Sequence, residues 1–195
     1  FRLVDQHGAT VACHADRVFF VDDFCDLVES GELWFDGGFS QRHLGKLQII
    51  RPAIRLGGTV SHSGSLWVDP RYRGKGLSLY LPYLSRSLLL RNYETEFNTG
   101  VVFKSLAGSR VPTANYGYPH VELCVDGYFP PTGKDEQIYL CYVSQVESLQ
   151  QLRRLAWHPA FPVPVAESLE SEVVEPPVVD ADQQHVYMPA IVRQR

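Results

Sequence analysis

A short basic stretch joins a predicted strand to a predicted helix. It reads Val68-Asp69-Pro70-Arg71-Tyr72-Arg73-Gly74-Lys75-Gly76, and an apolar run from Leu77 to Leu90 follows it at once. Apolar residues recur in this run at helical spacing, with polar residues between them: Leu77, Tyr80, Leu81, Leu84 and Leu88, with Ser78, Ser85 and Arg86. Pro82 removes one backbone N–H, so we expect a kink near the second turn. The stretch therefore predicts a strand, a basic loop and a long helix in this order.

The chemistry that suits this loop is anion binding. A helix N-terminus leaves backbone N–H groups without partners and carries partial positive charge. Glycines at Gly74 and Gly76 would let a phosphate approach those groups, and Arg71, Arg73 and Lys75 add mobile positive charge. We therefore predict a pyrophosphate site here. A basic turn that caps an ordinary amphipathic helix is the alternative.

Two common phosphate motifs do not fit the loop. The Walker loop needs Ser or Thr after Gly-Lys, but Gly76 follows Lys75, and the dinucleotide fingerprint needs a glycine spacing that is absent. What remains is Arg71-x-x-Gly74-x-Gly76 between a strand and a helix. This pattern resembles the acyl-CoA pyrophosphate loop of the GNAT N-acetyltransferase superfamily, whose motif reads Gln/Arg-x-x-Gly-x-Gly/Ala.

Composition narrows the class of protein. With 45% hydrophobic residues the chain of 195 residues predicts a soluble globular domain, and a net charge of -4 argues against a nucleic-acid partner. No apolar run approaches the roughly 20 residues that a membrane-spanning helix needs. The four cysteines show no zinc-ligand spacing, so we expect no metal site and a cytoplasmic location.

Further elements are expected on both sides of the loop. Before it we predict a hairpin, a short helix and two strands, at residues 1–21, 22–33, 47–50 and 59–68, with a bulge near Gly64. After the long helix we predict strands at 99–103, 121–125 and 137–143 and a last helix opened by the capping box of Ser144 and Glu147. A short helix near Pro112 should end at Gly117. The predicted domain covers residues 1–158, and a Pro-rich acidic tail covers 159–195.

The order of elements from Thr59 to Val143 resembles the second half of a GNAT domain, and the pair Gly117-Tyr118 stands where that family often has Gly-Phe. The resemblance implies an α/β fold of the GNAT type. It has a mixed, mainly antiparallel sheet flanked by helices, with a V-shaped opening between the fourth and fifth strands. The first half of the chain departs from the family, which usually has a strand and two helices there.

The resemblance also implies the residues that bind acetyl-CoA, which would be a co-substrate. Leu66, Trp67 and Val68 would meet the pantetheine arm, and the loop residues Arg71, Arg73, Gly74, Lys75 and Gly76 would bind the phosphates. No metal is implied.

Transfer of an acyl group to an amine needs a base for the ammonium and a hydroxyl donor for the leaving sulfur. His62 and Glu122 are the base candidates, with His120 beside them; an exposed strand histidine or a plain hydrogen-bonding role is the alternative. Thr113 stands at the place where many family members have the tyrosine acid, so Tyr116 is the nearest replacement. A role in the core or in a helix cap is the alternative for Tyr116.

The sequence therefore predicts an acyl-CoA-dependent N-acyltransferase that transfers an acetyl group to a primary amine of a small molecule or peptide by direct attack. The same fold with a longer acyl-CoA donor is one alternative. The other alternative is a catalytically idle, GNAT-like domain that binds CoA as a sensor or serves as an interaction module. A homodimer is compatible with either function.

Overall fold

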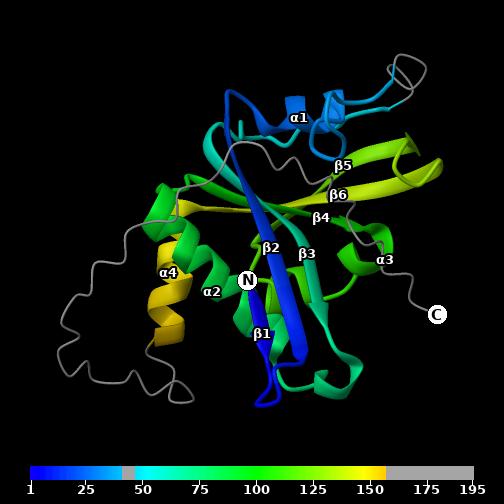
Figure 1. Ribbon diagram of the computed structural model, residues 1–195. Helices are drawn as coiled ribbons and strands as arrows, with labels where there is room; N and C mark the ends of the chain where they lie inside the picture. The colour runs from blue at the N-terminus through cyan, green and yellow to red at the C-terminus, as the bar shows by residue number, and fades with distance from the viewer. Residues whose placement is uncertain (41–46, 157–195) are drawn as a thin grey trace.

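The computed structural model describes residues 1–40 and 47–156. It contains a six-stranded sheet in the order β1-β2-β3-β4-β6-β5. The strands are β1 (Arg2–Val4), β2 (Thr10–Val21), β3 (Gly58–Val68), β4 (Phe97–Phe103), β5 (His120–Phe129) and β6 (Lys134–Ser144). Only β3 and β4 pair in parallel; the other pairs are antiparallel. The mixed, mainly antiparallel sheet is therefore confirmed (Figure 1), whereas the predicted tail at 159–195 lies outside the described residues.

The N-terminal hairpin and the short helix after it are confirmed. Gly8 takes a positive φ of 81° in the turn between β1 and β2. Helix α1 (Phe24–Ser30) begins at Asp23, whose carboxylate accepts a hydrogen bond of 3.0 Å from the amide of Cys25. It ends at Gly31, which adopts the left-handed conformation that an αL cap requires.

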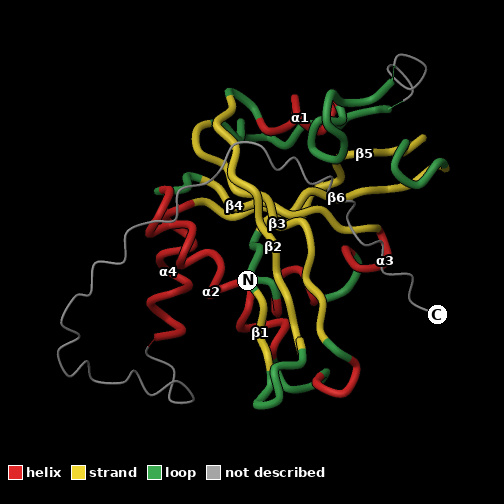
Figure 2. The backbone as a smooth tube through the Cα atoms, viewed as in Figure 1, coloured by secondary structure: helices red, strands yellow, loops and turns green. Residues whose placement is uncertain are grey.

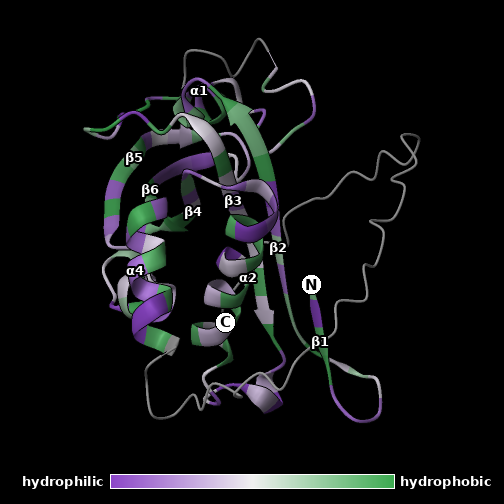
Figure 3. Ribbon diagram, turned by 90° about the vertical axis from the view of Figure 1, so that its left-hand side faces the viewer, coloured by the Kyte–Doolittle hydropathy of each residue, from purple (hydrophilic) through white to green (hydrophobic). Residues whose placement is uncertain are grey.

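Helices lie on both faces of the sheet. Helix α1 packs on one face over the larger apolar cluster, which includes Phe24, Val28, Val60, Val125 and Leu140. Helices α2 (Leu77–Tyr93) and α4 (Gln145–Ala156) lie side by side over the other face, as Figures 1 and 3 show. Side chains of the sheet therefore face either α1 or the pair of helices α2 and α4.

Helix α2 is confirmed and continues through Pro82, but its buried face differs from the apolar pattern. Leu84 and Leu88 are 52% and 42% exposed, whereas Arg86 is only 2% exposed. The buried positions are Leu81, Pro82, Tyr83, Ser85, Arg86 and Leu89. Because apolar residues occur all round this helix, periodicity alone does not identify the face that meets the sheet.

Two predicted strand regions differ from the structure. The segment 47–50 forms only a single bridge, between Ile49 and Val125, so it is not a strand. Strands β5 and β6 reach much closer to their turn than predicted, because the pairing continues to Phe129 and Lys134. The long hairpin loop predicted after Val125 is therefore a short turn.

The connections between β4 and the last helix follow the prediction more closely. One helical turn, α3 (Lys104–Ala107), follows β4, and a π-helical turn, η2 (Val111–Asn115), leads to Gly117 at φ 69°. The capping box is present: the amide of Ser144 donates to Glu147 at 2.9 Å, and the amide of Glu147 donates to the Ser144 hydroxyl at 3.3 Å. None of the described helices has the length and apolar character needed to cross a bilayer.

Candidate functional site

The two parallel strands of the sheet part from each other halfway along β3. Pairing between β3 and β4 runs from Val60↔Phe97 to Ser63↔Gly100 and stops there. Beyond that point β3 stays paired with β2 as far as Val68 (Figure 2). Gly64 has no partner in the register of β2, which places a bulge at the start of the divergence. The predicted bulge is present. The predicted opening lies between β3 and β4, the third and fourth strands and not the fourth and fifth, because the segment 47–50 is not a strand. We call the point between Ser63 and Gly100 the strand fork.

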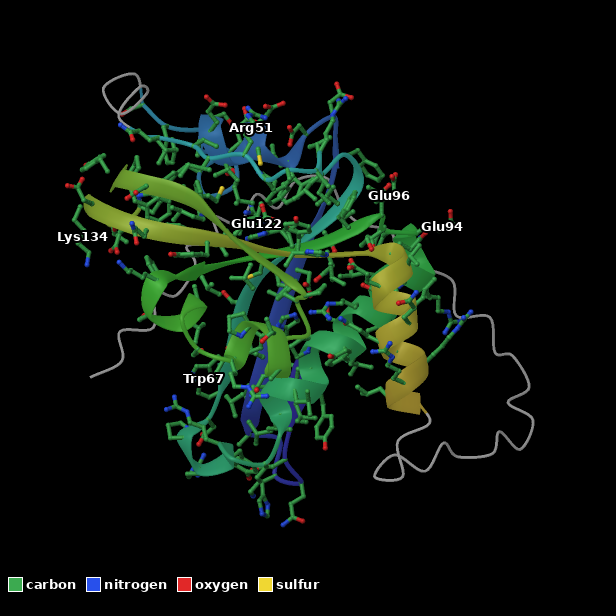
Figure 4. All side chains as sticks on the ribbon, turned by 180° about the vertical axis from the view of Figure 1, so that it is seen from behind. Arg51, Trp67, Glu94, Glu96, Glu122 and Lys134 are labelled. Atoms are coloured by element: carbon green, nitrogen blue, oxygen red, sulfur yellow. The ribbon has the colours of Figure 1, made fainter. Side chains whose placement is uncertain are left out.

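Beyond the strand fork, β3 carries the residues predicted to meet a pantetheine arm. Leu66, Trp67 and Val68 pair with His14, Cys13 and Ala12 of β2, and all three are partly buried. Figure 4 shows Trp67 near the end of β3 that leads into the basic loop. The β4 side of this segment makes no strand pairing within the described residues.

The loop after β3 leaves backbone amides free at the start of α2. A 3₁₀ turn, η1 (Pro70–Tyr72), is followed by Gly74 and Gly76 at φ 76° and 77°. No described residue accepts a hydrogen bond from the amides of residues 74–78. A Cβ at Gly74 would meet nothing within 4 Å, whereas a Cβ at Gly76 would lie 3.0 Å from the ring of Tyr80, so the open space is beside Gly74. The local geometry therefore offers several N–H donors to an anion.

The three basic side chains of the loop have different partners. Arg71 is held by Asp69, with Nε 3.1 Å from Oδ1 and a terminal nitrogen 2.9 Å from Oδ2. Arg73 Nε donates to the carbonyl of Val68 at 3.3 Å, and Lys75 Nζ lies 4.7 Å from the centre of the Tyr72 ring. Arg71 is thus neutralised inside the loop, whereas the other two cations have no carboxylate partner among the described residues.

His62 lies just before the strand fork on the α1 face. It is 3% exposed and stacks on Phe24 with the ring centres 5.4 Å apart. Burial, together with the nearby charge of Arg17, lowers the pKa of His62 to about 3. His62 is therefore a buried, neutral imidazole at physiological pH, and not an exposed strand histidine.

Glu122 and His120 lie further along the same face, on β5. Glu122 accepts a hydrogen bond from the hydroxyl of Tyr142, and Figure 4 shows it well separated from Trp67. The ring of His120 stacks on Tyr142 at 4.6 Å, and its Nε2 lies 2.8 Å from a carboxylate oxygen of Glu147. Burial and the bond to Glu122 raise the pKa of Tyr142.

Tyr116 lies apart from His62 and Glu122, because it packs in the smaller apolar cluster with Val102 and Cys141. Burial raises the pKa of its hydroxyl. The hydroxyl of Thr113 donates to the carbonyl of Arg110 at 3.2 Å on the exposed surface of η2. The structure therefore does not bring the three predicted catalytic residues together.

Tyr118 and Arg86 are at the strand fork, and sequence reasoning missed them. The hydroxyl of Tyr118 is 3.2 Å from Ser63 Oγ and 3.0 Å from the carbonyl of Thr99, and the Arg86 guanidinium lies over its ring. One signal was available for Tyr118, since it follows the glycine that ends η2. No sequence signal was available for Arg86, because apolar residues occur all round α2.

Residues 1–40 and 47–156 contain no cluster of side chains that could bind a metal ion. No group of three or more His, Cys, Asp or Glu side chains converges there. All four cysteines are free thiols, and Cys25, Cys124 and Cys141 are buried.

Comparison with known proteins gives only distant similarity. No family model and no curated protein matches the chain. A point mutant of the spermidine N-acetyltransferase SpeG from Vibrio cholerae aligns with 70% of this chain and 98% of its own, at 10% identity and a TM-score of 0.38. The spermidine N-acetyltransferase from Vibrio cholerae in complex with CoA and spermine aligns with 70% of this chain and 98% of its own, at 9% identity and a TM-score of 0.35.

A third similar structure is the ribosomal-protein-S18-alanine N-acetyltransferase of Escherichia coli. It aligns with 67% of this chain and 94% of its own, at 14% identity and a TM-score of 0.31. Superpositions this loose do not decide family or activity. The functional inference therefore rests on the strand fork and the loop of this chain.

Proposed function

We propose that this protein is a GNAT-type N-acyltransferase that moves an acetyl group from acetyl-CoA to a primary amine. One combined feature supports this function best. The parallel strands β3 and β4 part at the bulge of Gly64, and β3 then leads directly to free amides at the N-terminus of α2. This arrangement suits an extended ligand with an acyl group at one end and a diphosphate at the other.

In this proposal each part of the opening binds one part of acetyl-CoA. The free amides from Gly74 onwards, together with Arg73 and Lys75, bind the pyrophosphate. Gly76, the N-cap of α2, lets the chain turn into the helix at positive φ. Arg71 contributes less to binding, because Asp69 already holds it. The backbone from Leu66 to Val68 faces the pantetheine arm.

The reaction joins the amine nitrogen to the acyl carbon and breaks the carbon–sulfur bond. A base must first remove a proton from the ammonium. We propose Glu122 for this step, either directly or through water. His62 was the other predicted base and lies on the same face, but burial lowers its pKa to about 3, so it is a weak base and contributes less. Tyr116 is the hydroxyl that the sequence suggested for the leaving sulfur.

A second candidate function is a domain that binds CoA without turnover. Thr113 supports it, since the hydroxyl at this place is turned to the carbonyl of Arg110 on an exposed turn. Under this function the loop and opening bind CoA, and no amine is acetylated.

Two measurements test the proposal. Calorimetry with CoA tests binding, and release of free thiol from acetyl-CoA over a panel of monoamines, polyamines and peptide amines tests transfer. We expect binding and amine-dependent thiol release from the full chain. Binding without release for any amine supports the second candidate, and absence of CoA binding contradicts both.

A further inference from the structure

Helix α2 carries an exposed apolar row on the side turned away from the sheet. Leu84 and Leu88 are 52% and 42% exposed, and Tyr80, one turn earlier, is 37% exposed. These residues recur every four positions, so they lie in one row along the helix. Neither leucine belongs to an apolar cluster of the described residues. The row, which we call the α2 stripe, is therefore apolar surface that another segment of protein could cover.

Helix α4 shows where the chain leaves this layer of the structure. Nε2 of Gln145, the first residue of α4, lies 3.4 Å from the carbonyl oxygen of Glu94, just past the end of α2. Further along α4, Oε1 of Gln151 accepts a hydrogen bond of 3.3 Å from Arg86, which lies about two turns earlier in α2. The two helices are therefore antiparallel, and Figure 3 shows them side by side. With a rise of about 1.5 Å per residue, α4 ends at Ala156 beside the first half of α2.

The sequence that follows Ala156 contains an apolar segment between two charged ones. Residues 167–182 carry six carboxylates and no Lys or Arg. Residues 186–192 read Val-Tyr-Met-Pro-Ala-Ile-Val, and two arginines follow within three positions. Pro189 disfavours a helix here and favours an extended segment. Seven extended residues span roughly 20 Å, enough to cover the α2 stripe, which is about 12 Å long.

The end of α2 that lies near Ala156 is positively charged. Arg73 and Lys75 precede the helix and form no ion pair with a carboxylate of residues 1–40 or 47–156. Arg153 and Arg154 add two exposed cations in the last turn of α4. The acidic stretch that begins at residue 167 can reach this end, since ten extended residues span roughly 30 Å. Opposite charges therefore favour that stretch beside the N-terminus of α2.

The other end of α2 is negatively charged. Glu94 and Glu96 are exposed and form no ion pair within the part of the chain that the structure describes. Figure 4 shows both at the end of the molecule away from Trp67. Arg91, in the last turn of α2, offsets part of this charge. A segment that runs along α2 from its N-terminus therefore passes cations, then the α2 stripe, then carboxylates, and residues 167–195 carry the complementary groups in this order.

We propose that residues 186–192 dock on the α2 stripe of their own chain. The segment runs in the direction of α2. Residues 167–182 lie beside the basic N-terminal end of the helix, and Arg193 and Arg195 lie beside the carboxylates at its C-terminal end. Because the segment is joined to α4 next to the stripe, its effective concentration there is about millimolar, so weak contacts are sufficient. The inference depends neither on CoA binding nor on acetyl transfer.

The test measures how fast a thiol on the α2 stripe reacts with iodoacetamide in the full chain. Leu84→Cys reports on the stripe, and Leu149→Cys is the matched control, because Leu149 is 43% exposed on α4 and lies outside the stripe. Peptide mass spectrometry separates these thiols from the native cysteines. We expect the thiol at position 84 to react at least about tenfold more slowly than that at position 149. Leu88→Cys repeats the measurement, because Leu84→Cys itself removes part of the apolar row.

Variants of the segment show whether it causes the protection. Ile191→Asp places a charge in the apolar segment and should bring the rate at position 84 within about twofold of that at position 149. Arg193→Glu combined with Arg195→Glu should raise the rate about threefold at low salt, and less at high salt. Ser171→Asp adds a charge outside the apolar segment and should not raise the rate.

Three results overturn the inference. Equal rates at positions 84 and 149 in an otherwise natural chain would show that the stripe is open. Protection that persists in Ile191→Asp would mean that another segment covers it. Protection that appears only as the protein concentration rises from about 1 to 100 µM would mean that a second copy of the chain covers it. Protection that is independent of concentration and lost in Ile191→Asp supports docking within one chain.

Discussion

His62 Nδ1 lies 3.0 Å from the hydroxyl of Thr99, and that hydroxyl donates to the carbonyl oxygen of Ser61 at 2.9 Å. Because the Thr99 hydrogen is committed to Ser61, Nδ1 of His62 must carry the proton of the pair. The imidazole is therefore fixed in one tautomer and held neutral against Phe24. Protonation would place a charge in the apolar layer beneath α1.

This arrangement predicts a loss of stability on acidification. The pKa of His62 is about 3 in the folded chain and 6.5 as its ordinary value, so the unfolded chain binds more protons between these limits. Stability should be fully present above pH 6.5 and fall as pH drops toward 3, by at most about 1.4 kcal/mol per pH unit from this group. Urea unfolding at pH 7.5 and pH 5 measures it. His62→Gln should reduce the pH dependence; an unchanged dependence contradicts the assignment.

The ion pair between Asp69 and Arg71 predicts that the loop arginines contribute unequally to CoA binding. Hydrogen bonds from the side chain and the amide of Arg71 lower the pKa of Asp69 to about 2, so the pair persists at physiological pH. Arg71→Ala should weaken CoA binding less than about threefold, and Arg73→Ala about tenfold at low salt. Calorimetry at two salt concentrations measures both. Equal losses for the two variants would show that Arg71 leaves Asp69 to bind phosphate.

Two substitutions at Gly74 separate the effect of charge on CoA binding from the effect of backbone strain. Its φ is 76°, and a side chain there would point into open space. Gly74→Ala should cost roughly 1 kcal/mol of stability from the left-handed backbone and leave CoA affinity nearly unchanged. Gly74→Glu carries the same strain but adds negative charge beside the free amides, so CoA binding should fall at least about tenfold. Equal affinity of the two variants would place the phosphates elsewhere.

The features of this fold that were predicted correctly depend on local chemistry. Pro70, Gly74 and Gly76 mark a change from strand to helix, and these residues act over a few positions. The bulge at Gly64 and the capping box of Ser144 follow the same rule. These features can be predicted from the sequence because they depend on neighbouring residues and not on contacts between distant parts of the chain.

The features that were missed depend on distant contacts. Arg86 is buried because carbonyls of the segment after η2 and Gln151 of α4 surround it, and no residue near it in sequence indicates this. Tyr118 reaches the strand fork because Gly100, on another strand, leaves room for its hydroxyl. The segment 47–50 has strand-like residues but pairs only through the bridge between Ile49 and Val125 of β5, a contact with a residue 76 positions away in the sequence.

Substitution of Gly117 should cause the largest loss of stability among these variants, because backbone strain and side-chain crowding coincide at this position. Its φ is 69°, and a Cβ would lie 2.4 Å from the Tyr83 hydroxyl and 2.9 Å from Arg86 Nη1. Its carbonyl also accepts from Gln151 at 3.0 Å, so the backbone cannot move away without losing that bond. Gly117→Ala should therefore lower the free energy of unfolding by about 3 kcal/mol.

Gly133 supplies the matched control for this substitution. It has nearly the same φ, 70°, but a Cβ there would meet nothing within 4 Å. Gly133→Ala therefore carries the left-handed strain without the crowding and should cost only about 1 kcal/mol. Urea unfolding of both variants at one pH measures the difference, which is the packing cost around Arg86 and Tyr83. If the two variants lose the same stability, the contacts around Gly117 are loose and Arg86 is not held tightly there.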